Sequence, residues 1–226
     1  MKLFSRNSEP SDPETIINDC LKAVVNRISD SFDEAEYHWT KPWGVKRFES
    51  IILAKFMLDY SFNKLAEDKL GDDERTGYHN LCDISFSNIF NDEFSSVGLN
   101  YEDMQEEIQV KIDSYFEARR GSKPPFCWHS IYQLITRTSS KEEIQEDIAK
   151  KTAGLELIRR NDNFASMVPQ YEMQIKILKE KENSFESAEM MLPHMLRFTK
   201  DKLRAIKLKK IKAISKKLSK QEKGKK

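Results

Sequence analysis

Residues 48–62 read FESIILAKFMLDYSF, and the prediction of the architecture starts from them. Successive residues of a helix are 100° apart, so these apolar side chains occupy nearly every direction around the axis. A helix that is apolar almost all round is covered by other elements on several sides. The sequence therefore predicts a central helix over about 45–70, surrounded by other helices.

Amphipathic segments lie on both sides of this central helix. Asp12, Pro13 and Glu14 have the order of an N-cap, a first-turn proline and a first-turn acid, which starts a helix. Further helices are expected over 77–94, 100–120, 126–136 and 140–161. The 226 residues include only seven Gly and seven Pro, too few for the many tight turns of an all-β fold. We predict an all-α fold, an irregular helical bundle of about seven helices.

The last third of the chain leaves one element open. Tyr171, Met173, Ile175 and Ile177 alternate with polar residues, which is the period of a strand. A helix also fits residues 171–178, and we favour it because no partner strand is evident. Residues 183–186 then resemble a capping box that opens a helix reaching about residue 218. Pro193 is expected to kink that helix or to mark a boundary in it.

The net charge of +1 conceals a strong asymmetry. Residues 200–226 hold twelve lysines and one arginine against two acids, a net charge of +11, so residues 1–199 carry −10. We therefore predict a disordered N-terminus over 1–11, an acidic helical bundle over 12–182, an amphipathic basic C-terminal helix over 183–219 and a flexible basic tail over 220–226.

The basic C-terminal helix is the predicted interaction element. Its apolar arc needs a neighbour, and its lysines suit a protein groove, a nucleic-acid backbone or an anionic membrane surface. The opposite charges of the two parts of the chain favour a protein partner or a homo-oligomer. Nucleic acid is the first alternative and would be bound without sequence preference; a membrane surface is less favoured. The predicted partner-binding residues are Lys202, Leu203, Arg204, Ile206, Lys209, Ile211, Lys212, Ile214 and Lys216.

Motifs for catalysis or metal binding are not evident in the sequence. It has no Gly-rich phosphate loop and no nucleophile elbow. His79 and Asp83 are one helical turn apart, but two ligands are too few for a metal site. We therefore predict no catalytic residue, no metal, no cofactor and no small-molecule ligand. The chain is expected to be a non-enzymatic adaptor or regulatory protein.

A small helical enzyme is the second alternative. Lys55 and Asp59 are four residues apart on the central helix and project from otherwise apolar directions. As a buried ionisable pair they could line a pocket, and as a salt bridge they would be structural. The turn before the helix supplies the other candidate pocket residues, which are His38, Trp39, Trp43 and Arg47.

Composition also bears on location. No apolar run reaches the roughly 18 residues of a membrane span, and residues 1–11 lack the apolar core of a secretory signal. The three cysteines are far apart and odd in number, which does not suggest a disulfide framework. We expect a cytoplasmic protein.

Overall fold

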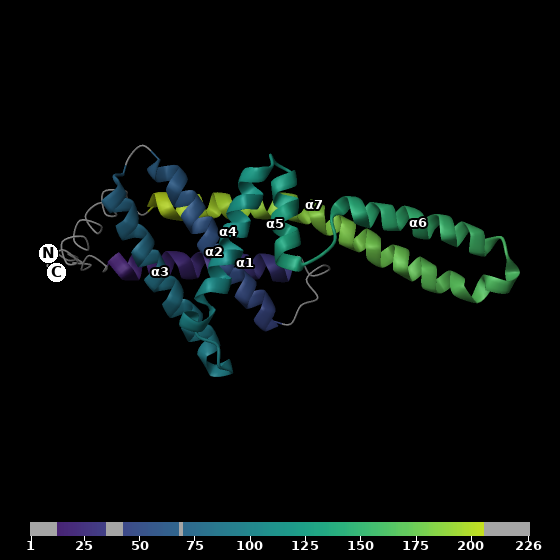
Figure 1. Cartoon of the computed structure of the whole chain (residues 1–226), viewed down its shortest axis with the longest axis horizontal. Helices are drawn as coiled ribbons and strands as arrows, with labels where there is room; N and C mark the ends of the chain where they lie inside the picture. The colour runs from purple at the N-terminus through teal and green to yellow at the C-terminus, as the bar shows by residue number, and fades with distance from the viewer. Residues whose placement is uncertain (1–12, 35–42, 68–69, 206–226) are drawn as a thin grey trace, which may run out of the picture. The chain divides into compact units, whose positions relative to one another are not determined.

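A computed structural model of the chain describes residues 13–34, 43–67 and 70–205. Within these ranges the chain forms seven α-helices, two short 3-10 helices and no strand, which confirms the predicted all-α fold (Figure 1). The elements are α1 (Pro13–Glu34), α2 (Trp43–Ala66), α3 (Asp72–Phe94), η1 (Ser95–Val97), α4 (Tyr101–Gly121), α5 (Phe126–Thr136), α6 (Lys141–Arg159), η2 (Asp162–Met167) and α7 (Val168–Ala205).

The helices contribute to two compact units, and neither unit is continuous in sequence. The first unit comprises the described residues of 1–28, 50–110 and 196–226. The second unit comprises the described residues of 29–49 and 111–195. Four helices, α1, α2, α4 and α7, contribute residues to both units.

The first unit is built around α2. Every residue of this helix from Ile51 to Asp59 is buried, as the apolar pattern predicted. Apolar side chains of α1 and α3 complete the core, and the rings of Phe62 and Tyr78 stack face to face. The other large core residues of α1 and α3 are Ile17, Leu21, Val24, Val25, Ile28, Leu81, Phe86, Ile89 and Phe90.

The second unit combines α5 with a helical hairpin. In the hairpin, α6 and the first half of α7 run antiparallel and side by side (Figure 1). Side-chain hydrogen bonds join Gln145 to Glu182 at 2.7 Å, Lys151 to Gln174 at 2.7 Å and Arg159 to Glu172 at 2.6 Å. Nearer to α5, the ring of Phe185 packs edge-on against the ring of Tyr132.

Helix α7 corrects the predicted division of the C-terminal third. Residues 171–178 are helical, as favoured, but the predicted helix start at Asn183 is wrong because α7 runs unbroken from Val168. Instead of capping a helix end, the hydroxyl of Ser184 donates to the carbonyl oxygen of Lys181, one turn earlier in the same helix. Pro193 lies inside α7, and the helix continues past it to Ala205. The predicted continuation over residues 206–219, the tail over 220–226 and the N-terminal segment over 1–11 lie outside the described residues.

Candidate functional site

Four ionisable side chains of the first unit form what we call the buried charge cluster: the buried Lys55 and Asp59, and beside them the half-buried His79 and the exposed Asp83. Lys55 and Asp59 are each 6% exposed and form an ion pair within α2. Two residues of α3 extend the pair. The Nζ of Lys55 lies 2.9 Å from Oδ1 of Asp83, and Nδ1 of His79 lies 3.5 Å from Oδ1 of Asp59. Residues 79 and 83, one turn apart on α3, thus approach an ion pair on α2.

The environment of the cluster stabilises its charged forms. Burial by itself would lower the pKa of Lys55, but the neighbouring carboxylates of Asp59 and Asp83 raise that pKa above its ordinary value. Burial would likewise raise the pKa of Asp59, but hydrogen bonds and positive charge from His79 and Lys55 hold that pKa below its ordinary value. Burial and the charge of Asp59 raise the pKa of the neighbouring Cys82 thiol.

These shifts limit what chemistry the cluster can perform. A nucleophilic lysine needs a lowered pKa, and a general acid needs a carboxyl group whose pKa is raised toward neutrality. Lys55 and Asp59 are shifted in the opposite directions. The thiol of Cys82 is held in its protonated, unreactive form. Lys55 itself occupies the position between the carboxylates of Asp59 and Asp83 that a cation would take. The arrangement is that of a neutralised structural ion pair.

Of the other predicted pocket residues, the structure describes Trp43 and Arg47. His38 and Trp39 lie outside the described residues. Trp43 is the first residue of α2. Arg47 belongs to the second unit, where its guanidinium donates to the hydroxyl of Ser29 at 3.1 Å.

Three of the predicted partner-binding residues lie at the described end of α7. Leu203 is 2% exposed, whereas Lys202 and Arg204 are exposed. The Nζ of Lys202 lies 5.3 Å from the centre of the Phe198 ring. The apolar arc is therefore covered by the chain itself as far as Leu203. The remaining predicted residues, Ile206, Lys209, Ile211, Lys212, Ile214 and Lys216, lie outside the described residues.

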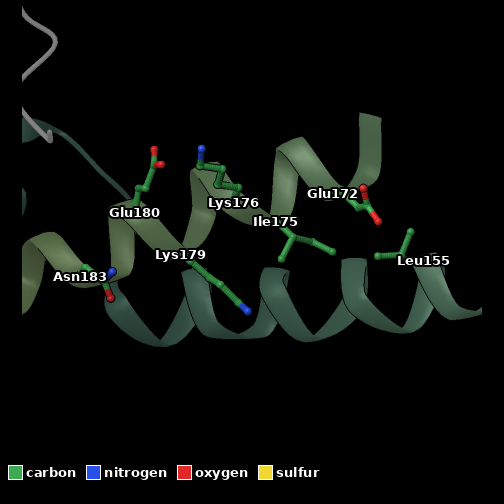
Figure 2. A pocket seen from close by; sticks show the side chains of 7 residues that line it. All are labelled: Leu155, Glu172, Ile175, Lys176, Lys179, Glu180 and Asn183. Carbon is green, nitrogen blue, oxygen red and sulfur yellow. The ribbon is translucent and has the colours of Figure 1, made fainter. Parts of the chain in front are cut away.

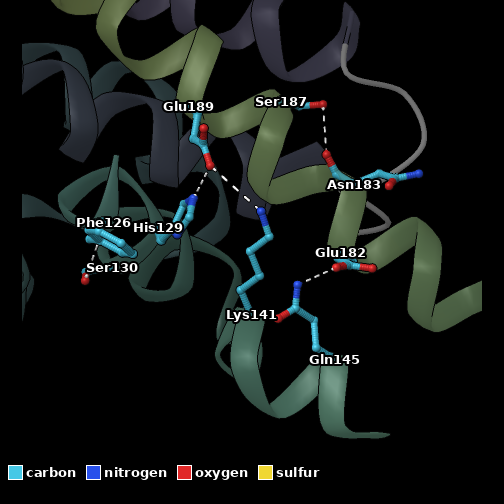
Figure 3. Close-up of polar contacts among 9 residues, drawn as sticks. All are labelled: Phe126, His129, Ser130, Lys141, Gln145, Glu182, Asn183, Ser187 and Glu189. Atoms are coloured by element: carbon cyan, nitrogen blue, oxygen red, sulfur yellow. Dashed lines mark hydrogen bonds and ion pairs between the residues drawn. The ribbon is translucent and has the colours of Figure 1, made fainter. Parts of the chain in front are cut away.

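A polar cluster in the second unit escaped the sequence analysis. The carboxylate of Glu189 on α7 contacts Nε2 of His129 on α5 and lies 3.9 Å from Nζ of Lys141 on α6 (Figure 3). These contacts join three helices at the base of the hairpin. Because His129 and Glu189 are 60 residues apart, no local spacing in the sequence could have indicated their contact.

The second feature that escaped prediction is an exposed apolar surface on the hairpin. We call Met173 and Ile177 the outer face of α7; they are 66% and 42% exposed. Beside this face, an open groove of about 300 Å³ follows one flank of the hairpin (Figure 2). Leu155 and Ile175 form its apolar floor. Its polar lining consists of Glu172, Lys176, Lys179, Glu180 and Asn183.

The sequence did contain a signal for this surface. Residues 171–177 alternate between apolar and polar side chains, and on a helix this alternation places apolar residues on two opposite faces. Tyr171 and Ile175 lie on the face toward α6, where the ring of Tyr171 approaches Gly154 and Ile175 is buried. Met173 and Ile177 lie on the other face. The pattern that resembled a strand is that of a helix with two apolar faces.

Comparisons with known proteins add no functional information. No protein-family model, no curated protein and no solved structure matches this chain. Among the described residues, no group of three or more His, Cys, Asp or Glu side chains is placed to hold a metal ion. No described helix has the length and apolar character required to cross a membrane.

Proposed function

We propose that this chain is a non-enzymatic helical interaction protein that binds a protein partner through the outer face of α7. The observation that carries the proposal is that α7 is apolar on two faces within the hairpin, while α6 covers only one of them. A surface helix of a globular protein normally has a single apolar stripe. A second apolar face is a surface suited to a partner.

The outer face continues a stripe that is core elsewhere in the second unit. At 100° per residue, positions 173, 177, 184, 188 and 195 fall within an arc of about 60°. Ser184, Ala188 and Met195 on this arc are all buried, with exposures of 2%, 1% and 1%. Met173 and Ile177 extend the same stripe beyond the part that the unit itself covers. A partner helix seated there would continue an existing packing arrangement.

The chemistry of the buried charge cluster supports a binding role over a catalytic one. Catalytic groups need pKa values matched to proton transfer near the working pH. The pKa values of Lys55 and Asp59 are shifted away from that range, so the second alternative, an enzyme pocket around this pair, has no support from their chemistry.

The basic C-terminal segment is proposed as a second contact of the same function. Leu203 is buried and anchors the end of α7, while Lys202 and Arg204 are exposed. Ten lysines and one glutamate follow in residues 206–226. Such a segment would bind an acidic protein surface by charge attraction. If it bound nucleic acid instead, log K would fall linearly with log salt, as phosphate contacts require.

The test is affinity purification of the full chain from the organism that produces it, with and without nuclease. Two variants are compared: a double substitution Met173→Glu with Ile177→Glu, and a matched control Met190→Glu, which changes a methionine of α7 that is 72% exposed. We expect the double variant to lose a protein partner that the control retains. Equal recovery by both variants would contradict the proposed surface. Recovery that is abolished by nuclease would assign the chain to the nucleic-acid alternative.

A further inference from the structure

We infer that the partner on the outer face of α7 is a second copy of this chain, so that two α6–α7 hairpins pack together into a four-helix assembly. This inference rests on the proposed function, and it adds the identity of the partner. It places Met173 and Ile177 at the centre of a contact between copies.

The hairpin alone is an incomplete packing unit. Among the side chains of residues 141–183 whose burial the structure describes, only Ile144, Leu155 and Ile175 are buried. Large apolar side chains remain exposed along it, including Leu157 at 67% and Phe164 at 47%. Two antiparallel helices share only one interface, whereas helical bundles of four bury a stripe on every helix. A second hairpin supplies the two helices that are missing.

The charge of the hairpin suits a copy of itself. Residues 141–183 contain nine acids and eight bases, so two hairpins together experience almost no long-range repulsion. Elsewhere the chain is strongly polarised: residues 72–117 hold twelve acids against two bases, and the C-terminal segment is basic. A polyanion or a polycation would therefore find no complementary field on the hairpin.

The groove beside the outer face has mixed charges as well. Glu172 and Glu180 line it together with Lys176 and Lys179. Figure 2 shows Lys176 and Glu180 directed away from α6, so they can meet a neighbouring chain. A two-fold axis brings the same surface of each copy face to face. Lys176 and Glu180 of each copy can then pair with the opposite charges of the other copy.

Intermolecular disulfide formation tests the contact directly on the purified full chain. A copy with Met173→Cys is mixed with a copy with Ile177→Cys under mild oxidation. The three natural cysteines are buried and do not compete. We expect covalent dimers to form at least tenfold faster than with the control Met190→Cys. Equal rates for the contact variants and the control would overturn the inference.

Mass measurement by analytical ultracentrifugation provides the second readout. The unmodified chain is expected at twice the mass of one chain, and the double substitution Met173→Glu with Ile177→Glu at the mass of one chain with an unchanged circular dichroism spectrum. A single-chain mass for the unmodified protein at high micromolar concentration would overturn the inference. If that monomer still lost a different protein partner through the double substitution, the proposed function would stand without the second copy. If it lost none, both would fail.

Discussion

Lys55 is a charged side chain that the core of the first unit accommodates because two carboxylates neutralise it. Taking an isolated ammonium group out of water is costly, and the cost is offset only when partners are close and well placed. Asp59 and Asp83 supply those partners from two different helices. The contribution of the pair is seen most clearly when one member is removed, because the other is then left as a buried, unpaired charge.

The change Lys55→Met is expected to lower the free energy of unfolding by about 3–5 kcal/mol, since it leaves Asp59 buried without its cation. Urea denaturation measures this loss. Lys64→Met is the matched control, because Lys64 lies on the same helix and pairs with Glu67 at 3.3 Å on the exposed surface. The control should lose less than about 1 kcal/mol. Similar losses for both changes would show that the Lys55 pair is not a buried one.

The low pKa of Asp59 predicts how stability depends on pH. A carboxyl group whose pKa is lower in the folded state than its ordinary value of 3.8 stabilises the fold above that pH. This contribution is lost as pH falls through the folded-state pKa. The difference in unfolding free energy between the unmodified chain and Asp59→Asn should therefore be larger at about pH 5 than at about pH 3, and it should shrink as the pH falls below about 4. A difference that grew on acidification would contradict the assigned direction.

At the scale of the elements, the start of α6 depends on one hydroxyl group. The backbone N–H of Glu143 donates to Oγ of Ser140 at 3.1 Å, and the backbone N–H of Ser140 donates to the Glu143 carboxylate at 2.9 Å. Two N–H groups that lack intrahelical partners are thereby satisfied. The N-cap of α6 is therefore Ser140.

Replacement of this cap should weaken the hairpin measurably. Ser140→Ala is expected to lower the free energy of unfolding by about 1 kcal/mol, because the backbone N–H of Glu143 in the first turn of α6 loses its acceptor. Ser139→Ala is the control and should change stability by less than about 0.5 kcal/mol. Chemical denaturation of both variants measures these two losses in the free energy of unfolding. A larger loss for Ser139→Ala than for Ser140→Ala would show that Ser140 is not the residue that caps α6.

The all-α fold and the positions of most helices could be predicted from the sequence, because amphipathic periods and helix caps are local properties. The all-round apolar run of α2 correctly predicted a buried helix. The start of α7 was missed because the residues at 183–186 have the composition of a cap, whereas tertiary packing buries Ser184 and Phe185 inside a longer helix. Contacts between distant helices, such as His129 with Glu189, have no local signature.

For the candidate site, the sequence indicated part of the arrangement. Lys55 and Asp59 were recognised as a pair because their spacing and their apolar surroundings are visible along one helix. Their partners on α3 were not, because only the fold brings residues 79 and 83 to them. The outer face of α7 was visible as an alternation, but its meaning depended on knowing that α6 covers only the opposite side.

At the scale of the whole molecule, the basic end of the chain separates into an anchored part and a charged part. Leu203 is 2% exposed, so it contributes to the core of the first unit. Residues 206–226 carry a net charge of +9, and their removal changes the net charge of the chain from +1 to −8. A truncation after residue 205 therefore removes the positive charge of residues 206–226, and a truncation before Leu203 removes the buried side chain as well.

A chain ending at Ala205 should keep the melting temperature of the full chain. A chain ending at Thr199 should be less stable by about 2–5 kcal/mol, because it loses the buried Leu203 side chain. Differential scanning calorimetry of the two truncated chains measures the contrast, and the full chain is the reference. Equal melting temperatures for the two truncated chains would show that Leu203 does not hold α7 in place.

The discontinuous make-up of the first unit has a consequence for synthesis. The described residues of that unit come from 13–28, from 50–110 and from 196–205. The ribosome delivers these pieces in order, so every residue of the second unit is translated before the first unit receives its α7 residues. Until then, the part of the first unit that comes before residue 111 keeps some of its apolar surface exposed to water. This apolar surface is therefore covered only after the end of α7 has been released.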